Sequence, residues 1–405
     1  MNFLYNKWYN LYLFKIGLRK IIMREKNNFF YFDFVGTFGG AQQSTSALLN
    51  FIKENSNIRP IVYYVEGTSP LFLDSLEVEK EKIKTINFKK FNIFNINRQY
   101  FYTICYYFFL LISLLLKKNN NSVLMCNTPK SLVLLCFLKF FKNVEIHYYC
   151  RGWGKKESFS PVIKFFLKFM VNKVYAVSTN TASNLKEFIN KKKIFVTYTS
   201  VNLINIDNQK NKKINVDFPI NKIKIVFGGA IVKTKGLHTL LKSIALLPQN
   251  IQSEIIIYIA GDYKKNPDYF ELCNGIISVL CCKVFWLGWL NNMPSLIYNS
   301  DIICLPSFSE GLPRIIQEGM YLKKICISTP VGGVPDLIEH QKTGFLFEVE
   351  DFEALSLLIS QVIKEKTNWD FIGENARTLI LNKYCLNIQG ELFIKAFKQD
   401  IYCED

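Results

Sequence analysis

The residues of this sequence whose types and spacing best suit chemistry are two glutamates, Glu310 and Glu318, with seven residues between them. They follow an apolar, strand-like run over 301–306, and Pro313 lies between them. Proline suits the first turn of a helix, because the N–H that it lacks would have no partner there. The sequence therefore predicts Glu310 in the loop before a helix and Glu318 one to two turns inside that helix.

A carboxylate in such a loop suits the hydroxyls of a sugar. Backbone amides of the loop and of the helix N-terminus face any anion that docks there, such as a phosphate. The carboxylate would accept from sugar hydroxyls, these amides would donate to the phosphate, and the second glutamate would reach a ribose on the same side. The simpler interpretation is a carboxylate that stabilises the helix dipole, by about 0.3 to 1 kcal/mol. For an isolated pair of glutamates the simpler interpretation is the more common one.

The downstream sequence favours a nucleotide-sugar site. It contains Val331-Gly-Gly-Val-Pro-Asp336, then Thr343-Gly-Phe-Leu-Phe-Glu348 and Asp351. In order and spacing, roughly the second half of the chain resembles the C-terminal domain of the retaining nucleotide-sugar glycosyltransferases of the GT-B fold (group 1, family 4-like). Asp336 stands where that family usually has glutamate. The resemblance implies an α/β fold of the GT-B type, with two Rossmann-like doubly wound domains facing a central cleft.

Length and composition agree with such a fold. With 405 residues, 49% of them hydrophobic, the chain can form two or three domains with sizeable cores. The 11 cysteines include no Cys-x-x-Cys motif, and without a recognisable secretory signal they favour reduced thiols in a cytoplasmic protein. The three histidines, His147, His238 and His340, lie far apart and no Asp-x-Asp occurs. We therefore expect no metal and no cofactor, with a nucleotide diphosphate sugar as co-substrate.

The excess of positive charge lies in the first half of the chain. Of the net charge of +17, residues 1–202 carry +18 and residues 203–405 carry −1. Such a field attracts nucleic acid, anionic membrane or phosphorylated substrates, but no nucleic-acid-binding signature accompanies it. In the GT-B family the N-terminal domain receives the acceptor, so a glycan or polyprenyl-diphosphate-linked acceptor at an anionic membrane surface would explain the asymmetry. A coding bias toward Lys, Asn and Ile explains the lysines but not their one-sided placement.

Two segments of the first half suit contact with a membrane. Residues 1–26 place apolar side chains at helical spacing among Lys and Arg, as in an interfacial amphipathic helix. An ordinary helix packed on the domain, and a true start at Met23, are equally open interpretations. The second segment, Tyr100 to Leu116, is mostly apolar but shorter than the about 20 residues of a membrane span, and we interpret it as a buried helix.

The chain is expected to divide into two domains joined by a polar linker. We expect a candidate amphipathic segment over 1–26, an acceptor-side Rossmann-like domain over 27–205, a linker over 206–222, a nucleotide-sugar-binding Rossmann-like domain over 223–385, and a C-terminal helix over 386–405 that crosses back to the first domain. The linker is placed on the stretch Asp207 to Lys213, which is polar and lacks apolar periodicity.

The first domain offers a glycine loop between an expected strand and an expected helix. Gly39 and Gly40 let the backbone approach a phosphate without a Cβ in the way. Their position matches the glycine loop that the family has near the donor diphosphate. Further on, many relatives carry His-Gly near the reacting carbon, where this chain has Arg151-Gly152. Arginine cannot act as a base, so Arg151 would either stabilise charge on the diphosphate or be a surface residue at a turn.

The second domain opens with Gly229-Ala-Ile-Val-Lys-Thr-Lys-Gly after an expected strand. Here the family has Gly-Arg and then Lys-Gly, with both cations on the donor diphosphate. Lys235 matches the lysine, whereas Ala230 stands in place of the arginine. Lys233 or Arg151 would then supply the missing charge.

The resemblance also assigns the remaining donor contacts. The segment with Leu287 and Gly288 is similar to the one near the donor base, and amides near Gly311 and Leu312 would stabilise the departing diphosphate together with Lys235. The predicted site residues are, as catalytic residues, Glu310, Lys235 and Arg151, and, as donor-binding residues, Gly39, Gly40, Gly229, Lys233, Leu287, Gly288, Gly311, Leu312 and Glu318.

The resemblance implies a metal-independent, retaining hexosyltransferase. It would move a hexose from a nucleotide diphosphate sugar to a glycan or lipid-linked acceptor, in O-antigen or capsule biosynthesis, as a cytoplasmic protein peripheral on the inner face of the plasma membrane. The missing arginine and histidine leave open a non-catalytic nucleotide-sugar-binding scaffold. A nucleotide-sugar 2-epimerase on the same fold is a further alternative.

Overall fold

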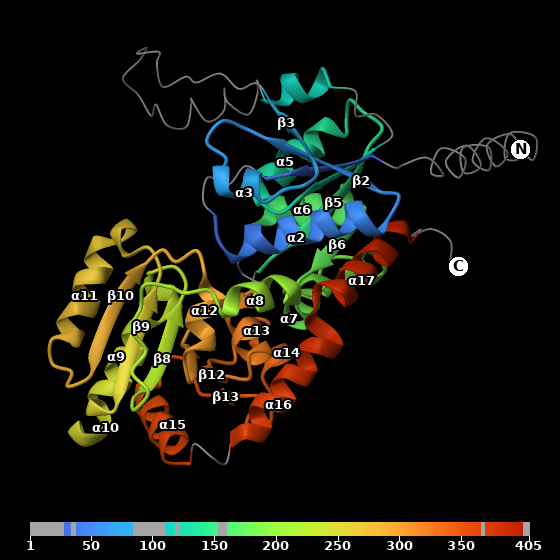
Figure 1. Ribbon diagram of the computed structural model, residues 1–405. Coiled ribbons are helices and arrows are strands. Elements are labelled where there is room, and N and C mark those ends of the chain that lie inside the picture. The colour runs from blue at the N-terminus through green and yellow to red at the C-terminus, as the bar shows by residue number, and fades with distance from the viewer. Residues whose placement is uncertain are drawn as a thin grey trace, which may run out of the picture. The chain divides into compact units, whose positions relative to one another are not determined.

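The computed structural model describes residues 28–33, 38–83, 110–117, 122–152, 160–365 and 369–399. The chain divides into two units. The first comprises the chain up to Cys150 with Ser160–Tyr175 and Phe188–Ile194, and the second comprises Arg151–Phe159, Ala176–Glu187 and the chain from Phe195 on. Each unit is built around its own β-sheet, with helices beside it (Figure 1).

The first unit is built around a seven-stranded sheet with the order β3-β2-β1-β4-β5-β6-β7. The pairs β3–β2, β2–β1, β1–β4 and β4–β5 are parallel. The strands are β1 (Asn28–Phe32), β2 (Arg59–Tyr64), β3 (Glu79–Lys82), β4 (Val123–Cys126), β5 (Glu145–Cys150), β6 (Lys173–Ala176) and β7 (Ile194–Val196). The helices of this unit are α2 (Gly40–Asn55), α3 (Pro70–Asp74), α5 (Pro129–Leu138) and α6 (Pro161–Phe169), with the 3₁₀ turn η3 (Lys191–Lys193). Helix α7 (Thr179–Lys186) follows β6 in the sequence but belongs to the second unit.

The second unit is built around a six-stranded parallel sheet with the order β10-β9-β8-β11-β12-β13. Its strands are β8 (Ile223–Gly228), β9 (Ile255–Ala260), β10 (Lys283–Gly288), β11 (Ile302–Leu305), β12 (Ile325–Ser328) and β13 (Phe345–Leu346). The direction of strand addition reverses between β8 and β11. In doubly wound sheets, ligands bind outside the carboxyl ends of the strands at such a reversal.

Of the helices of the second unit, α7 and α8 precede the first strand, and the others connect these strands or follow the last of them. Besides α7, they are α8 (Leu203–Lys210), α9 (Leu237–Ala245), α10 (Gln249–Ser253), α11 (Pro267–Ile277), α12 (Met293–Tyr298), α13 (Arg314–Tyr321), α14 (Val334–Leu337), α15 (Phe352–Lys364), α16 (Asp370–Leu379) and α17 (Leu386–Lys398). Short 3₁₀ turns, η4 (Lys233–Lys235) and η5 (Tyr263–Lys265), follow β8 and β9, and a π-helical turn, η7 (Ile380–Tyr384), joins α16 to α17.

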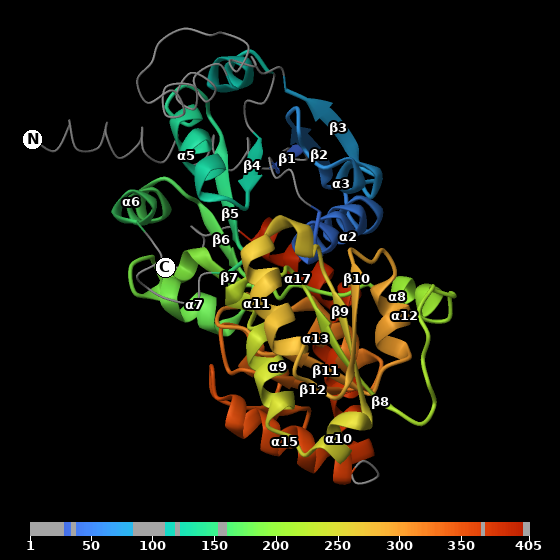
Figure 2. The ribbon, with the colours of Figure 1, turned by 90° about the vertical axis from the view of Figure 1, so that its left-hand side faces the viewer.

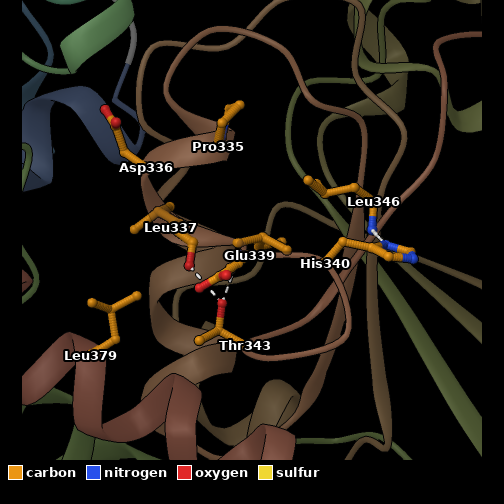
Figure 3. Close-up of a pocket in the computed structure, with 9 residues that line it drawn as sticks. Pro335, Asp336, Leu337, Glu339, His340, Thr343, Leu346 and Leu379 are labelled. Carbon is orange, nitrogen blue, oxygen red and sulfur yellow. Dashed lines mark hydrogen bonds between the residues drawn. The ribbon is translucent and has the colours of Figure 1, made fainter.

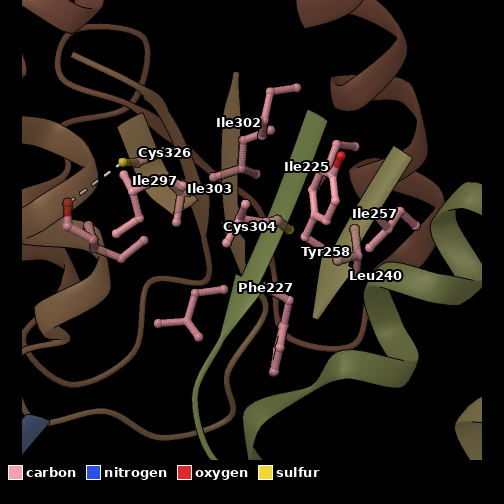
Figure 4. Packing of buried hydrophobic residues seen from close by; sticks show 14 of the residues in the cluster. Ile225, Phe227, Leu240, Ile257, Tyr258, Ile297, Ile302, Ile303, Cys304 and Cys326 are labelled. Atoms are coloured by element: carbon pink, nitrogen blue, oxygen red, sulfur yellow. Dashed lines mark hydrogen bonds between the residues drawn. The ribbon is translucent and has the colours of Figure 1, made fainter. Parts of the chain in front are cut away.

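The core of the second unit explains why its strands are continuous apolar runs. All six residues of β9 are buried, as expected for a parallel strand with both faces covered. Side chains from neighbouring strands, such as Ile225, Tyr258 and Cys304, pack together with Leu240 of α9 and Ile297 of α12 (Figure 4). This core fixes the strand ends from which the loops of the candidate site extend.

Local sequence sets where several helices begin. Helices α5 and α6 each start at a proline that follows a hydroxyl residue, Thr128 or Ser160, whose side chain accepts from a backbone N–H of the first turn. Ser178 caps α7, since its Oγ accepts from the N–H of Thr181 at 3.1 Å. Strand β6 is therefore followed by a serine-capped helix.

The polar stretch that we expected to be linker begins inside a helix. Residues 207–210 are the last turn of α8, although their sequence lacks apolar periodicity. The helix is held by a single buried apolar residue, Ile206, by the Asn202 cap, and by Asp207 Oδ2, which accepts from the Tyr321 hydroxyl at 2.6 Å. Contacts within the folded unit therefore stabilise a helix that the sequence pattern does not indicate. The domain limits expected from the sequence stay predictions.

Three sequence expectations concern segments outside the described residues. These are the amphipathic segment 1–26, most of the run Tyr100 to Leu116, and the loop over 34–37. Among the described residues, no helix combines the length and the apolar character needed to span a bilayer.

Candidate active site

Two loops meet where the strand order of the second unit reverses. One follows β8 and contains η4, and the other follows β11. Phe308 N donates to Thr234 O at 2.9 Å, which ties the two backbones together. Gly236 follows η4 with φ of +72°, and a Cβ there would lie 1.8 Å from the carbonyl oxygen of Pro306. Only glycine fits this approach, so Gly236 sets how closely the two loops come together.

Lys235 and Glu310 form an ion pair across these loops. The distance from Lys235 Nζ to Glu310 Oε1 is 2.6 Å. Ser307 Oγ donates to the same oxygen, also at 2.6 Å. The Glu310 side chain is 7% exposed and the Lys235 side chain 28%, so the carboxylate is held inside while the ammonium reaches the surface. Among the described residues, no hydrogen bond ends on Glu310 Oε2, which leaves that oxygen to accept from a ligand.

Glu318 has a partner of its own. Arg314 Nε donates to Glu318 Oε1 at 2.6 Å, one turn apart on α13. Both side chains are largely buried, at 14% and 5% exposure. Glu310 lies in the loop before α13 and Glu318 in its second turn, as the spacing around Pro313 predicted.

A glycine turn supports the backbone at Glu310. Gly332 has φ of +57°, and a Cβ there would lie 1.7 Å from the carbonyl oxygen of Glu310. Its neighbour Gly333 donates from its N–H to Gly311 O at 2.8 Å. The Gly-Gly turn downstream of the glutamates therefore holds the loop that carries Glu310, a role that the sequence alone did not assign.

Arg151 approaches this loop through its backbone. A Cβ added to Gly311 would lie 2.0 Å from the carbonyl oxygen of Arg151, and one added to Gly152 would lie 3.1 Å from the Cα of Gly311. Such close packing requires glycine on both sides. The structure thus brings Arg151 next to the Glu310 loop, and the role of its side chain toward a diphosphate stays a prediction.

Residues 208–379 match the profile of the family described as Glycosyl transferases group 1. This segment is therefore similar to the group 1 glycosyltransferases. It contains the ion pair of Lys235 with Glu310, the pair of Arg314 with Glu318, and the glycine turn, so the geometry described above belongs to the part of the chain that matches the family.

Similar proteins extend this finding beyond this segment. The capsular polysaccharide biosynthesis glycosyltransferase CapM of Staphylococcus aureus is 24% identical over 289 residues, which cover 65% of this chain and 73% of CapM. A Campylobacter jejuni alpha-1,4-N-acetyl-D-galactosaminyltransferase, named for an undecaprenol-linked glycan, is 30% identical over 156 residues, 38% of this chain and 42% of that relative. The second alignment therefore spans less than half of the relative.

A solved structure supports the architecture. Anabaena HepE in complex with UDP-glucose has a TM-score of 0.75 and 18% sequence identity, and the match covers 92% of this chain and 100% of that one. At this identity the likeness concerns the fold. It confirms the α/β fold of the GT-B type, with two Rossmann-like units, that the sequence predicted.

Three glycines of the second unit lie side by side at the carboxyl ends of β8, β9 and β10. Gly229 follows β8, and a Cβ on Gly261 would lie 2.0 Å from its carbonyl oxygen. Gly261 N donates to the carbonyl oxygen of Gly288, the last residue of β10, at 2.8 Å. These three strands are adjacent, so the edge where Gly229 and Gly288 were predicted to contact the donor is lined by backbone.

The remaining predicted residues occupy different settings. Lys233 is exposed in η4, two residues before Lys235, whereas Leu312 is buried beside the glycine turn. Leu287 is partly buried in β10. Gly39 and Gly40 stand at the start of α2 in the first unit, and their contact with the donor stays a prediction.

Sequence reasoning missed three residues of this candidate site. Ser307 and Arg314 bind the two glutamates directly. The spacing of Arg314 and Glu318, four residues apart on a helix, was a usable signal for an ion pair. His238 had no such signal: its Nδ1 lies 2.7 Å from the Tyr269 hydroxyl, and its ring stacks on Phe308 with centroids 5.8 Å apart. His238 therefore packs against the loop that carries Glu310.

Burial of His238 lowers the pKa of its imidazole. Loss of solvation is the main cause, and the nearby ammonium of Lys242 adds to it, while Glu350 acts in the opposite direction. The ring is therefore held neutral, which suits its contact with the Tyr269 hydroxyl and the aromatic face of Phe308.

Asp336, which stands where the family usually has glutamate, binds the start of a helix. Its Oδ2 accepts from the N–H of Thr179 at 2.7 Å, and its Oδ1 accepts from the hydroxyl of the same residue. Thr179 is the first residue of α7, where a carboxylate is favoured by the unpaired amides and the helix dipole. The shorter side chain therefore has a structural use.

A cavity of about 540 Å³ lies beside α14, apart from the predicted donor contacts (Figure 3). It is lined by Pro335, Asp336, Leu337, Ile338, Glu339, His340, Thr343, Leu346 and Leu379, none of which is a predicted site residue. Its polar groups serve its own loop, since His340 Nδ1 accepts from Leu346 N at 3.0 Å and Thr343 Oγ1 donates to Leu337 O at 3.0 Å. These two bonds hold the loop that borders the cavity.

Proposed function

We propose that this protein is a retaining hexosyltransferase that uses a nucleotide diphosphate sugar. The observation that carries the proposal is the pairing of Lys235 with Glu310 at the strand reversal of the second unit. A cation and a carboxylate side by side suit a substrate that carries phosphate oxygens next to sugar hydroxyls. Glu310 Oε2 would accept from hydroxyls of the donor hexose, and the Lys235 ammonium would contact the diphosphate.

In the proposed reaction, the bond between the anomeric carbon and the diphosphate oxygen breaks while the acceptor oxygen bonds to the same face of that carbon. The proton of the acceptor hydroxyl passes to an oxygen of the leaving diphosphate, so no side chain has to act as base. Lys235 and the amides near Gly311 and Leu312 would stabilise the charge that develops on the leaving group. The proposed reaction uses neither a metal nor a cofactor.

Glu318 would bind the ribose of the nucleotide. Arg314 holds one of its oxygens and limits its rotation, so the carboxylate is oriented before the nucleotide binds. Gly229, Leu287 and Gly288 would lie along the rest of the nucleotide, where backbone is exposed by the glycines at the strand ends.

The acceptor in this proposal is a glycan or a polyprenyl-diphosphate-linked glycan, in O-antigen or capsule biosynthesis. Two relatives support this class, since one is named for capsular polysaccharide biosynthesis and the other for an undecaprenol-linked glycan. We place the reaction at the cytoplasmic face of the plasma membrane, where the basic first half of the chain would meet anionic lipid.

A non-catalytic nucleotide-sugar-binding scaffold is the second candidate. It is favoured by Ala230 and Arg151, at positions where the family has arginine and histidine. A scaffold would bind a donor but would not turn it over with any acceptor.

The first test is a thermal-shift and calorimetric screen of the full chain against UDP-, GDP-, ADP- and CMP-sugars. We expect one diphosphate donor to raise the melting temperature, and Glu318→Ala to remove the shift. Glu271→Ala, at an exposed position of α11, is the matched control. The selected donor is then incubated with membrane-derived acceptors.

Transfer that is retained at near-normal rate in Glu310→Ala would refute the role of Glu310. Binding of a donor without turnover on any acceptor would favour the scaffold. If no donor shifts the melting temperature, the site does not bind nucleotide sugars and the proposal fails.

A further inference from the structure

One surface of the first unit exposes many large apolar side chains. They come from the end of α5 and from α6, which pack side by side (Figure 2). We call this surface the aromatic face; its members are Phe137, Phe140, Phe141, Val162, Phe165 and Phe169, each between 47% and 68% exposed. Single exposed apolar residues are ordinary, but a contiguous group of this size marks an interaction site.

Ring contacts show that the aromatic face is continuous. Phe140 and Phe137 have ring centroids 6.4 Å apart, and Phe137 lies 6.0 Å from the buried Phe166. Phe166 in turn contacts Phe165 at 5.7 Å, and Phe165 contacts Phe169 at 5.1 Å. The rings thus form one connected row across both helices.

Helix α6 is apolar on two sides. Ile163, Phe166 and Leu167 are buried against the unit, whereas Val162, Phe165 and Phe169 face outward. A helix of a soluble domain normally turns charged and polar residues outward, and a helix that is apolar around most of its surface is normally covered. The outer side of α6 would therefore be stabilised by contact with an apolar partner.

Lysines lie on and beside the helices of the aromatic face, and Lys168 Nζ lies 5.3 Å from the centroid of the Phe169 ring. The stretches 129–144 and 160–186 contain no Asp or Glu. Lys130 and Lys168 are exposed on the two helices, and Lys191 and Lys192 are exposed in η3. Lys193 joins η3 to the end of α6, since its Nζ donates to Lys168 O at 3.2 Å and to Val171 O at 3.0 Å. The apolar rings thus carry a basic rim.

The aromatic face is held in place before any partner binds. Lys139, just after α5, donates from its Nζ to Met170 O at 2.7 Å and to Asn172 Oδ1 at 2.8 Å, both just after α6. The two helix ends are therefore fixed to each other, and binding needs little reordering of the backbone.

We propose that the aromatic face with its lysine rim docks the protein on an anionic lipid bilayer. Phenylalanine side chains would enter the boundary between head groups and acyl chains, while lysines contact anionic head groups. A second copy of the chain fits less well, because it would bring the lysines of two such faces together. The inference draws on the proposed function only for the place of the acceptor, since bilayer binding needs neither donor nor acceptor.

Co-sedimentation of the full chain with vesicles tests this proposal without any substrate. We expect binding to vesicles of phosphatidylcholine with phosphatidylglycerol, weaker binding to phosphatidylcholine alone, and weakening by salt. Phe165→Ser/Phe169→Ser should lower the partition coefficient about tenfold or more, since two large apolar groups no longer leave water. Lys168→Gln/Lys191→Gln should lower it by about fivefold per lysine on anionic vesicles only, because each lysine near the surface contributes about 1 kcal/mol.

Control variants distinguish binding through the aromatic face from non-specific binding through other exposed leucines and lysines. Leu272→Ser/Leu357→Ser removes two exposed leucines of α11 and α15, and Lys264→Gln/Lys265→Gln removes two lysines of η5; both should bind as the unchanged protein does. Circular dichroism and melting temperature show whether each variant is folded, and the lysine variants leave the core untouched.

Three results would overturn the proposal. The first is an absence of binding to anionic vesicles. The second is binding that Phe165→Ser/Phe169→Ser leaves unchanged but that removal of residues 1–26 abolishes, which would assign the membrane contact to that segment. The third is concentration-dependent self-association that these serine substitutions abolish without any vesicle binding, which would make the face an interface between copies. Since donor binding is measured separately, failure here leaves the proposed transferase standing.

Discussion

Lys235 Nζ lies 2.6 Å from Glu310 Oε1, although the two residues are 75 positions apart in the sequence. Each stands on a loop at the carboxyl end of one of two adjacent strands, β8 and β11. The backbone bond from Phe308 to Thr234 and the close approach of Gly236 to Pro306 bring these loops together. The pair therefore depends on the strand order of the sheet and on one glycine.

Removal of the Lys235 charge should affect catalysis more than folding. Lys235→Met keeps most of the apolar stem but cannot stabilise a leaving diphosphate, so we expect kcat to fall by about 10²- to 10³-fold, as for other donors to developing negative charge. Because the lysine is 28% exposed and Ser307 still donates to Glu310, the melting temperature should change little. Lys264→Met, at an exposed position of η5, is the control. A kcat within a few-fold of the unchanged protein would contradict the assigned role.

The sequence predicted the elements of this site better than the contacts within it. The positions of Glu310 and Glu318 relative to α13 followed from Pro313 and helix geometry, which are local properties. The support of Glu310 by Gly332 did not follow, because that contact joins two loops whose approach depends on the whole sheet. For the same reason His238 was listed only as one of three scattered histidines, although its ring stacks on Phe308 in the Glu310 loop.

Helix α8, whose last turn lies in the stretch expected to be linker, could not be predicted from the sequence pattern. A short helix with one buried apolar residue, Ile206, leaves no periodic signal in the sequence. Its stability comes from the hydrogen bond between Asp207 and Tyr321 and from packing of α8 on α12, which only the folded unit supplies. By contrast, strand β9 is visible in the sequence, because burial on both faces requires an unbroken apolar run.

The substitution Gly236→Ala should disrupt both stability and activity. The new Cβ would lie 1.8 Å from the Pro306 carbonyl oxygen, and the residue has φ of +72°. Gly67→Ala is a matched control, since its φ of +88° gives similar backbone strain but nothing lies within 4 Å of the added Cβ. We expect Gly67→Ala to cost about 1 to 2 kcal/mol from backbone strain alone and to leave transfer intact. Gly236→Ala should cost more in denaturant unfolding and should also lower kcat, and equal effects on unfolding would refute the contact.

The Arg314 side chain should act on nucleotide binding rather than on the chemical step. Arg314→Gln removes the charged donor from Glu318 Oε1, so the carboxylate is less well oriented toward a ribose. We expect KM for the donor to rise by about tenfold, at the lower end of what the loss of a supporting contact costs, with kcat at saturating donor nearly unchanged. Lys323→Gln breaks an exposed ion pair with Glu374 just after the same helix and should change neither parameter. A fall in kcat at constant KM in Arg314→Gln would place Glu318 in the chemical step instead.

The free energy of unfolding should decrease as the pH is lowered, because His238 then takes up a proton. Burial lowers the pKa of this imidazole below its ordinary value of 6.5, with Lys242 and Lys233 adding to the effect and Glu350 opposing it. Between that ordinary value and the lower pKa of the folded protein, the unfolded chain binds more protons than the folded one. The free energy of unfolding therefore decreases as the pH falls from 6.5 through this window, and it is unaffected by His238 above it.

The measurement for this prediction is urea unfolding of the unchanged protein and of His238→Gln at about pH 7.5 and about pH 5.5, on either side of the ordinary histidine pKa. Carboxylates also titrate as the pH falls. Burial of Asp207 raises the pKa of its carboxyl, but hydrogen bonds to Lys210 and Tyr321 act the other way and the net shift is downward. Such groups change the stability of both proteins equally, so their effect cancels in the comparison. The unchanged protein should lose more stability than the variant on going to the lower pH, because glutamine cannot titrate. An equal loss in the two proteins would mean that His238 is not held neutral. Since the ring stacks on Phe308, beside Ser307 and Glu310, the same drop in pH should also weaken donor binding in the unchanged protein.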